Sequence, residues 1–197
     1  MWLAAALLAG GLGCGSAPVI PPLETAASFP PPAAPAGNPD QILLKEALQG
    51  RTLSPPEVVS LSDRLLTGGN PASQDQETMA RLELLLLKAL KTEDQVSKAA
   101  LWRNLGIIHY NQKKYDRAQQ ELKKANEFNP KDARTHFYLA RLFYSQAEVC
   151  QRKGLKRKAQ GLSKQAATEL ELARKFAPGN PTYRQDLKQL MQQEPGK

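Results

Sequence analysis

The sequence has few of the residues that carry chemistry or staple small folds together. It holds two cysteines and two histidines in 197 residues, and aromatic residues make up 6% of the chain. Cys14 and Cys150 lie in unlike surroundings, which argues against a disulfide framework, and their spacing excludes a cysteine-based metal site. No set of His, Cys and Glu residues has ligand spacing, and no glycine-rich loop could cradle a phosphate. These absences predict a protein that is not an enzyme and uses no cofactor or metal.

Strand signals are missing as well. No run alternates between apolar and polar residues, whereas Leu, Ala, Lys and Gln dominate the second half of the chain, as is typical of helices. The stretch Ser54-Pro55-Pro56-Glu57 has the pattern of a capping box with proline at the first helical position. We therefore expect an all-α fold, with a helix over about residues 40–49 and two more between residues 55 and 90.

Charge is unevenly distributed along the chain. Residues 101–197 hold 20 of the 27 basic and 9 of the 19 acidic side chains, a net charge of +11, whereas residues 1–100 carry −3. This asymmetry fits an anionic partner or surface, and it also fits helix faces that are merely solvated.

The first residues have the character of an export signal. A short apolar run over residues 2–8 is far shorter than the ~20 residues of a membrane-spanning helix and fits the core of a signal peptide, although no Lys or Arg precedes it. The segment Gly11-Leu12-Gly13-Cys14 resembles a bacterial lipoprotein cleavage site. The resemblance implies a signal peptide over residues 1–14, lipidation of Cys14 and, with Gly15 next, sorting to the outer membrane. Cleavage without lipidation, or a misplaced start of the chain, stays open.

A proline-rich segment follows. Eight of the fifteen prolines fall within residues 16–39, and proline removes hydrogen-bond donors and favours an extended chain. We expect residues 15–39 to be a disordered spacer, with a proline-rich recognition motif as the alternative.

Regularly spaced landmarks occupy residues 99–132. They are Trp102, Leu105, Gly106, Tyr115, Ala118, Leu122, Ala125 and Pro130. Counted from Ala99, they fall where the 34-residue tetratricopeptide repeat has its own landmarks, so the segment resembles that helix-turn-helix unit. Small Gly106 and Ala118 let two helices approach closely, and Pro130 ends the second helix.

A second unit resembles the first but is longer. Residues 133–178 repeat the landmarks with 12 additional residues, which we expect to lengthen both helices and to place the turn between Gly154 and Gly161. Residues 40–98 would form N-terminal helices with a degenerate repeat, and residues 179–197 a C-terminal capping helix. The resemblance implies a right-handed superhelical solenoid of antiparallel helix pairs.

In repeats of this type, the first helices line a groove that binds a partner. Carried over, the groove residues are Arg103, Ile107, Tyr110, Asn111, Arg134, Phe137, Arg141 and Tyr144. Such a mixture of Arg, Tyr and Phe is typical of binding hot spots and indicates an extended or helical protein segment with acidic and apolar character. The alternative is that these residues are ordinary exposed or stacking residues.

The additional residues of the second unit are strongly basic. They include Arg152, Lys153, Lys156, Arg157 and Lys158, which could contact lipid headgroups, an acidic polymer or nucleic acid, or could simply keep a loop soluble. His109 and His136 fall at packing positions of the repeats. Cys150 is expected on a helix face, since no base adjoins it in the sequence.

These expectations combine into one hypothesis. The chain would be a non-catalytic adaptor, anchored by lipid at the outer membrane and facing the periplasm, that binds another protein and neither a small-molecule substrate nor nucleic acid. Similar lipoproteins assist the assembly of envelope complexes such as pilus secretins. The alternatives are a secreted or periplasmic protein, or a cytosolic regulator or nucleic-acid binder that uses the basic insertion.

Overall fold

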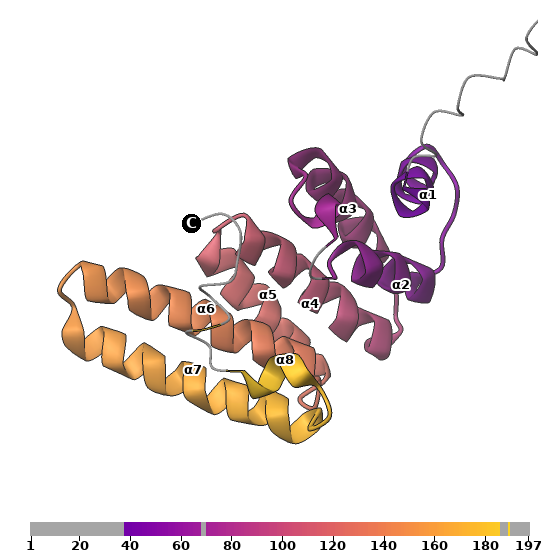
Figure 1. Ribbon diagram of the computed structural model, residues 1–197. Coiled ribbons are helices and arrows are strands. Elements are labelled where there is room, and N and C mark those ends of the chain that lie inside the picture. The colour runs from indigo at the N-terminus through magenta and orange to yellow at the C-terminus, as the bar shows by residue number, and fades with distance from the viewer. Residues whose placement is uncertain (1–37, 68–69, 186–188, 190–197) are drawn as a thin grey trace, which may run out of the picture. The chain divides into compact units, whose positions relative to one another are not determined.

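The structure, a computed structural model, describes residues 38–67, 70–185 and 189, and within them it contains helices and no strand. Cys14 and residues 15–37 of the expected spacer lie outside the described residues, whereas Pro39, expected at the end of the spacer, is the first residue of α1. In chain order the elements are α1 (Pro39–Leu48), α2 (Pro55–Leu65), the 3-10 turn η1 (Pro71–Ser73), α3 (Gln76–Ala89), α4 (Gln95–Asn111), α5 (Tyr115–Phe128), α6 (Ala133–Arg152), α7 (Lys156–Phe176) and α8 (Pro181–Arg184) (Figure 1). The fold is all-α, as the sequence predicts, and none of the described helices could span a bilayer.

Most helices begin at a polar side chain that accepts a hydrogen bond from a backbone N–H of the first turn. The capping residues of α1, α3, α4, α6 and α8 are Asn38, Asp75, Asp94, Asp132 and Asn180. At α2 the Glu57 carboxylate accepts from the Ser54 backbone N–H at 2.7 Å and from its hydroxyl at 2.6 Å. These hydrogen bonds lower the pKa of Glu57. Satisfying the otherwise orphaned donors is what sets these starting points.

The α4–α5 pair is held at close range by Gly106. A Cβ atom placed on Gly106 would lie 2.7 Å from Cγ of Leu122 and 3.3 Å from the carbonyl oxygen of Ala118. Leu105, Ala118 and Leu122 are completely buried around this contact. The absence of a side chain at position 106 therefore allows the approach, as the sequence predicts.

One landmark of the first unit, Trp102, is not enclosed by the helices. It is half-buried, and Nζ of Lys124 lies 4.2 Å from its ring centroid. A tryptophan with a cation over its face gains from the electrostatic attraction of the ring. Trp102 therefore covers the edge of the repeat rather than filling its centre.

The α6–α7 pair is the lengthened unit. Its helices have 20 and 21 residues, compared with 17 and 14 in α4 and α5. The turn, however, is confined to residues 153–155, where Gly154 takes φ +74°. Gly161 lies inside α7, so the expected turn over Gly154 to Gly161 is wrong at its far end.

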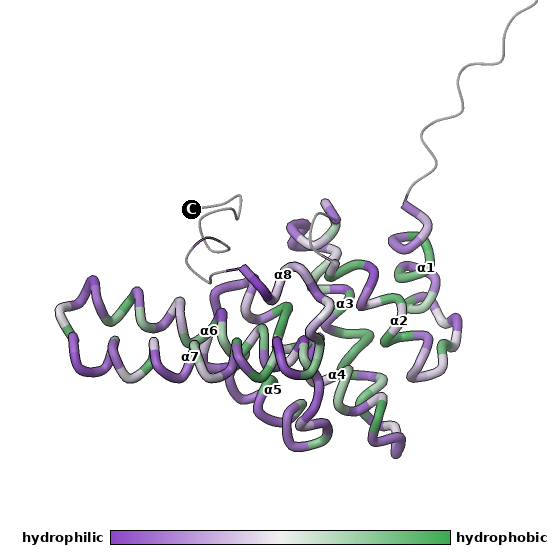
Figure 2. Tube along the Cα trace, turned by 60° about the horizontal axis from the view of Figure 1, so that its bottom comes forward, coloured by the Kyte–Doolittle hydropathy of each residue, from purple (hydrophilic) through white to green (hydrophobic). Residues whose placement is uncertain are grey.

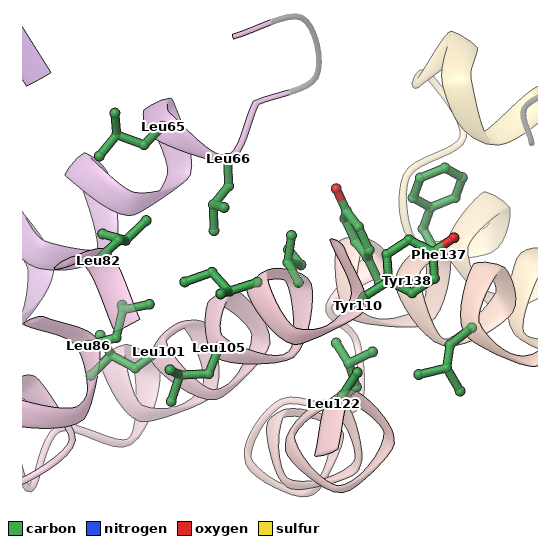
Figure 3. Packing of buried hydrophobic residues seen from close by; sticks show 14 of the residues in the cluster. Leu65, Leu66, Leu82, Leu86, Leu101, Leu105, Tyr110, Leu122, Phe137 and Tyr138 are labelled. Atoms are coloured by element: carbon green, nitrogen blue, oxygen red, sulfur yellow. The ribbon is translucent and has the colours of Figure 1, made fainter. Parts of the chain in front are cut away.

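One apolar core connects helices from α1 to α8. Figure 3 shows its middle, where Leu66, directly after α2, and Leu86 of α3 come together with Leu101 and Leu105 of α4. The core closes at the other end against Tyr183 of α8, whose ring centroid lies 4.8 Å from that of Phe137. Of the expected C-terminal capping helix, the structure describes Pro181–Arg184 as helical, and most of residues 186–197 lie outside the described part.

Candidate partner-binding face

The expected groove residues do come together on neighbouring first helices, α4 and α6, but most of them are not open to a partner. Ile107 is completely buried, and Tyr110 and Phe137 are 5% and 6% exposed. The expectation of an open stripe is therefore wrong at these positions, because the elements stacked on α4 and α6 cover them. Asn111 is exposed, and Arg134 and Tyr144 are half-buried.

Two of the expected groove arginines already hold a carboxylate. Oδ1 of Asp63, on α2, lies 2.7 Å from Nη2 of Arg103 and 2.7 Å from Nη1 of Arg134. Nη1 of Arg103 also lies 3.4 Å from Asp132. Side-chain exposure is 11% for Arg103, 23% for Arg134 and 36% for Asp63. One acidic side chain thus ties α2 to both first helices, in a partly desolvated place where charge-assisted hydrogen bonds are strong.

A buried amide completes this network. Asn104 has no exposed surface; its Nδ2 donates to Ser62 at 2.6 Å and to Asp63 at 3.0 Å, and its Oδ1 accepts from Nε of Arg103 at 3.0 Å. Both ends of the amide are therefore satisfied, as burial of a polar group requires. The network fixes the register between α2 and α4.

Arg141 sits among aromatic rings. Its guanidinium carbon lies 4.8 Å from the ring centroid of Tyr110, 5.0 Å from that of Tyr138 and 5.7 Å from that of Phe137. Figure 3 shows these three rings gathered where α4 meets α6. A cation held against several ring faces is stabilised while largely removed from water. Arg141 therefore contributes to the packing of this face.

Both histidines lie at packing positions, and both also hold carboxylates. In His109, Nδ1 lies 2.5 Å from Glu121 of α5 and Nε2 lies 3.2 Å from Glu83 of α3. In His136, Nδ1 lies 2.6 Å from Glu169 of α7 and Nε2 lies 2.9 Å from the Pro130 carbonyl oxygen.

His136 is held in its protonated form. An ionised carboxylate and a carbonyl oxygen can only accept, so both ring nitrogens must carry a proton to make both bonds. Burial works against the charge, but the hydrogen bonds from the ring to Glu169 and Pro130, with the nearby carboxylates of Glu169 and Asp132, outweigh it and raise the pKa of His136. The imidazolium acts as a pin between α6 and α7.

The described residues offer little for catalysis. No group of three or more His, Cys, Asp or Glu side chains among them could hold a metal ion. Both histidines are nearly closed to solvent, and Cys150 is a buried free thiol on α6. These three side chains are therefore closed to solvent in the described fold, whereas a nucleophile or a general base has to reach its substrate.

The accessible part of the expected groove lies around Tyr144. A surface hollow of about 390 Å³ is lined by Tyr144 of α6, by Ala166 and Leu170 of α7 and by Arg174 and Arg184. Arg174 donates to the Tyr183 carbonyl oxygen at 2.7 Å and holds Glu171. The hollow thus combines apolar side chains with two arginines and with Glu171, the carboxylate that pairs with Arg174. The contribution of α7 and α8 could not be inferred from the first-helix positions alone.

The sequence model of the tetratricopeptide repeat family matches residues 99–132, which cover α4 from Ala99 onward, all of α5 and the turn into α6. No curated protein matches the chain. The matched segment contains the Gly106 contact that brings α4 and α5 together. Residues 99–132 are therefore similar to a tetratricopeptide repeat, and they lie in an all-helical, repeat-like solenoid.

Proposed function

We propose that this chain is a non-catalytic adaptor that binds a segment of another protein on the face formed by α4, α6 and α7. The repeat over residues 99–132 carries the proposal, because a tetratricopeptide repeat suggests a protein-interaction role. The groove positions that remain accessible are Asn111 on α4 and Arg134 and Tyr144 on α6. The buried positions beside them keep the stripe rigid, which lowers the entropy lost on binding.

The hollow at Tyr144 indicates what the partner presents. Ala166 and Leu170 suit an apolar side chain of the partner, and Arg184, which donates to the neutral Pro178 carbonyl oxygen, suits an acidic neighbour, whereas Arg174 already pairs with Glu171. Aromatic and arginine side chains beside a small apolar pocket are typical of hot spots. An extended or helical segment that carries one apolar and one acidic residue fits this chemistry.

Site-specific photocrosslinking in the native host tests the proposal. A photoreactive amino acid at Asn111 or Tyr144 should capture one defined protein, whereas the same amino acid at Gln120 or Lys123, exposed on α5, should not. Tyr144→Ala should abolish capture at position 111 without altering the circular dichroism spectrum. Equal capture from both helices would overturn the proposed face, and capture of no protein from any position would overturn the adaptor role.

We propose further that the adaptor is attached to the cell envelope through lipid on Cys14, with residues 15–39 as its spacer, and that it assists assembly of an envelope complex of the pilus or secretin kind. The support is the sequence of the cleavage segment and the proline-rich run behind it. Metabolic lipid labelling with membrane fractionation is the test. A soluble, unlabelled protein that retains Met1 would rule out the anchor.

A further inference from the structure

The far end of the α6–α7 pair stands apart from the rest of the described fold. In both Figure 1 and Figure 2 the end near the turn extends past α4 and α5 and has no other helix beside it. Ala147, Cys150 and Ala159 are buried between the two helices there. The hairpin thus forms a firm projection, whose tip we define as residues 152–158.

The tip is basic and its charge is not neutralised. All five of its cationic side chains are exposed: Arg152, Lys153, Lys156, Arg157 and Lys158. No acidic residue lies between Glu148 and Glu169 in the sequence. Within the described part of the chain these five side chains make no ion pair, in contrast to Arg51, which pairs with Glu46 of α1, and to Arg81, which pairs with Glu77 on its own helix.

The placement of this charge does not serve the stability of the fold. Three of the cations occupy the first turn of α7, which has no acidic residue and no capping side chain. A helix N-terminus carries a partial positive charge, so basic residues there repel it. The tip therefore keeps a local concentration of charge that weakens its own helix.

The apex between the cations is apolar. Leu155 is 50% exposed at the start of α7, and the positive φ of Gly154 turns the chain so that Leu155 stands at the end of the hairpin. Basic side chains around a protruding apolar residue match the lipid–water interface, where phosphates lie outside the acyl chains.

We propose that the tip binds anionic phospholipid headgroups, with Leu155 inserted below the phosphates. A membrane surface fits the tip better than nucleic acid does. No aromatic residue lies between Tyr144 and Phe176, so the tip has no platform for stacking bases. Its cations also cluster at one end of the hairpin, whereas proteins that bind a nucleic-acid strand place basic side chains along a groove or along the length of a helix.

Vesicle co-sedimentation of the full chain tests the proposal, in a Cys14→Ser background so that attached lipid plays no part. The protein should bind phosphatidylcholine vesicles that contain phosphatidylglycerol much better than phosphatidylcholine alone, and added salt should weaken the binding. Each basic residue near an anionic surface is worth roughly a fivefold change in partition, so Lys156→Gln, Lys158→Gln and Arg157→Gln together should reduce binding about a hundredfold.

A matched control separates the tip from net charge. Lys88→Gln, Lys91→Gln and Lys123→Gln remove the same charge from exposed positions outside the α6–α7 pair and should leave binding nearly unchanged. Leu155→Ser should weaken binding several-fold while the charge of the tip stays intact. Thermal melts confirm that each variant folds.

Several outcomes would overturn the proposal. The first two are an equal loss of vesicle binding in the tip and control variants, and wild-type binding that does not depend on phosphatidylglycerol. The third is undiminished vesicle binding by Leu155→Ser. The fourth is displacement of the protein from vesicles by a short single-stranded DNA at the same phosphate concentration as the lipid. The last outcome would identify nucleic acid as the ligand. Because no protein partner takes part in the assay, its failure leaves the proposed adaptor role standing.

Discussion

Gly106 offers the sharpest test of the packing, because two opposing free energies can be assigned to it. Within a helix, alanine is more stable than glycine by about 1 kcal/mol. The Cβ of Gly106→Ala, however, would lie 2.7 Å from Cγ and 2.9 Å from Cδ2 of Leu122, which is completely buried and cannot easily withdraw. Overpacking of this kind costs about 1–3 kcal/mol. We expect Gly106→Ala to lower the free energy of unfolding by up to about 2 kcal/mol.

The sign should reverse when Leu122 is shortened. Leu122→Ala alone should cost about 2–5 kcal/mol, since it leaves a cavity between α4 and α5. In that background the added methyl group enters the cavity, so Gly106→Ala should gain up to about 1 kcal/mol from helix propensity. The coupling between the two changes measures the contact directly.

Gly161 is the matched control. It also lies inside a helix, but a Cβ atom there would meet nothing within 4 Å. Gly161→Ala should therefore stabilise the protein by about 1 kcal/mol, or about 2–4 °C in melting temperature for a chain of this size. Urea unfolding followed by circular dichroism at 222 nm (the usual helix band) gives all four values. If Gly106→Ala and Gly161→Ala are equally stabilising, the close approach of α4 and α5 is refuted.

Two further predictions concern the ionic contacts. Because the pKa of His136 is raised above its ordinary value near 6.5, the stabilisation that its charge provides is complete below that value and is lost as the pH rises through the raised pKa. Denaturation titrations from acid to alkaline pH should show this loss in the wild type but not in His136→Gln, and an identical profile for both would contradict the imidazolium pin to Glu169. Asp63→Asn should destabilise the fold by about 1–3 kcal/mol, since it leaves the guanidinium groups of Arg103 and Arg134 without their shared carboxylate at a partly exposed site. Addition of Arg103→Met should recover part of that loss, and strictly additive effects would argue against the pair.

Local features of the fold were predictable where a residue type has a single structural explanation. The capping box at Ser54 and the close contact at Gly106 follow from residue types that hydrogen bonding and space alone explain. Gly161, in contrast, was wrongly interpreted as part of a turn. A glycine inside a helix destabilises it by only about 1 kcal/mol, and a helix of 21 residues such as α7 tolerates that cost. The glycine therefore does not require a turn.

The candidate site was less predictable, because its contacts join residues far apart in the sequence. Spacing within a repeat placed Arg103 and Arg134 on one face, but it held no sign of Asp63, which arrives from α2 at 40 and 71 positions away. His109 likewise meets Glu83 of the preceding helix α3, although its other partner, Glu121, belongs to its own unit. Ion pairs between units depend on how the units stack, and the residue spacing within one unit does not predict which side chains of the next unit it will contact.

The Asp63 pairing changes which partner the face can select. A carboxylate from a partner could reach Arg103 and Arg134 only by displacing Asp63, and it would then leave that acidic side chain beside a like charge in a partly desolvated place. Such an exchange gains one charge-assisted contact for the loss of another, so an acidic partner obtains little net affinity there. At the Tyr144 hollow, Arg174 likewise pairs with Glu171. Arg184, in contrast, donates to the neutral carbonyl oxygen of Pro178, and it stands beside apolar side chains that an incoming side chain can cover. We therefore expect the α6–α7 end of the face to distinguish between partners, whereas the end near α2, whose arginines are paired with Asp63, contributes little to that choice.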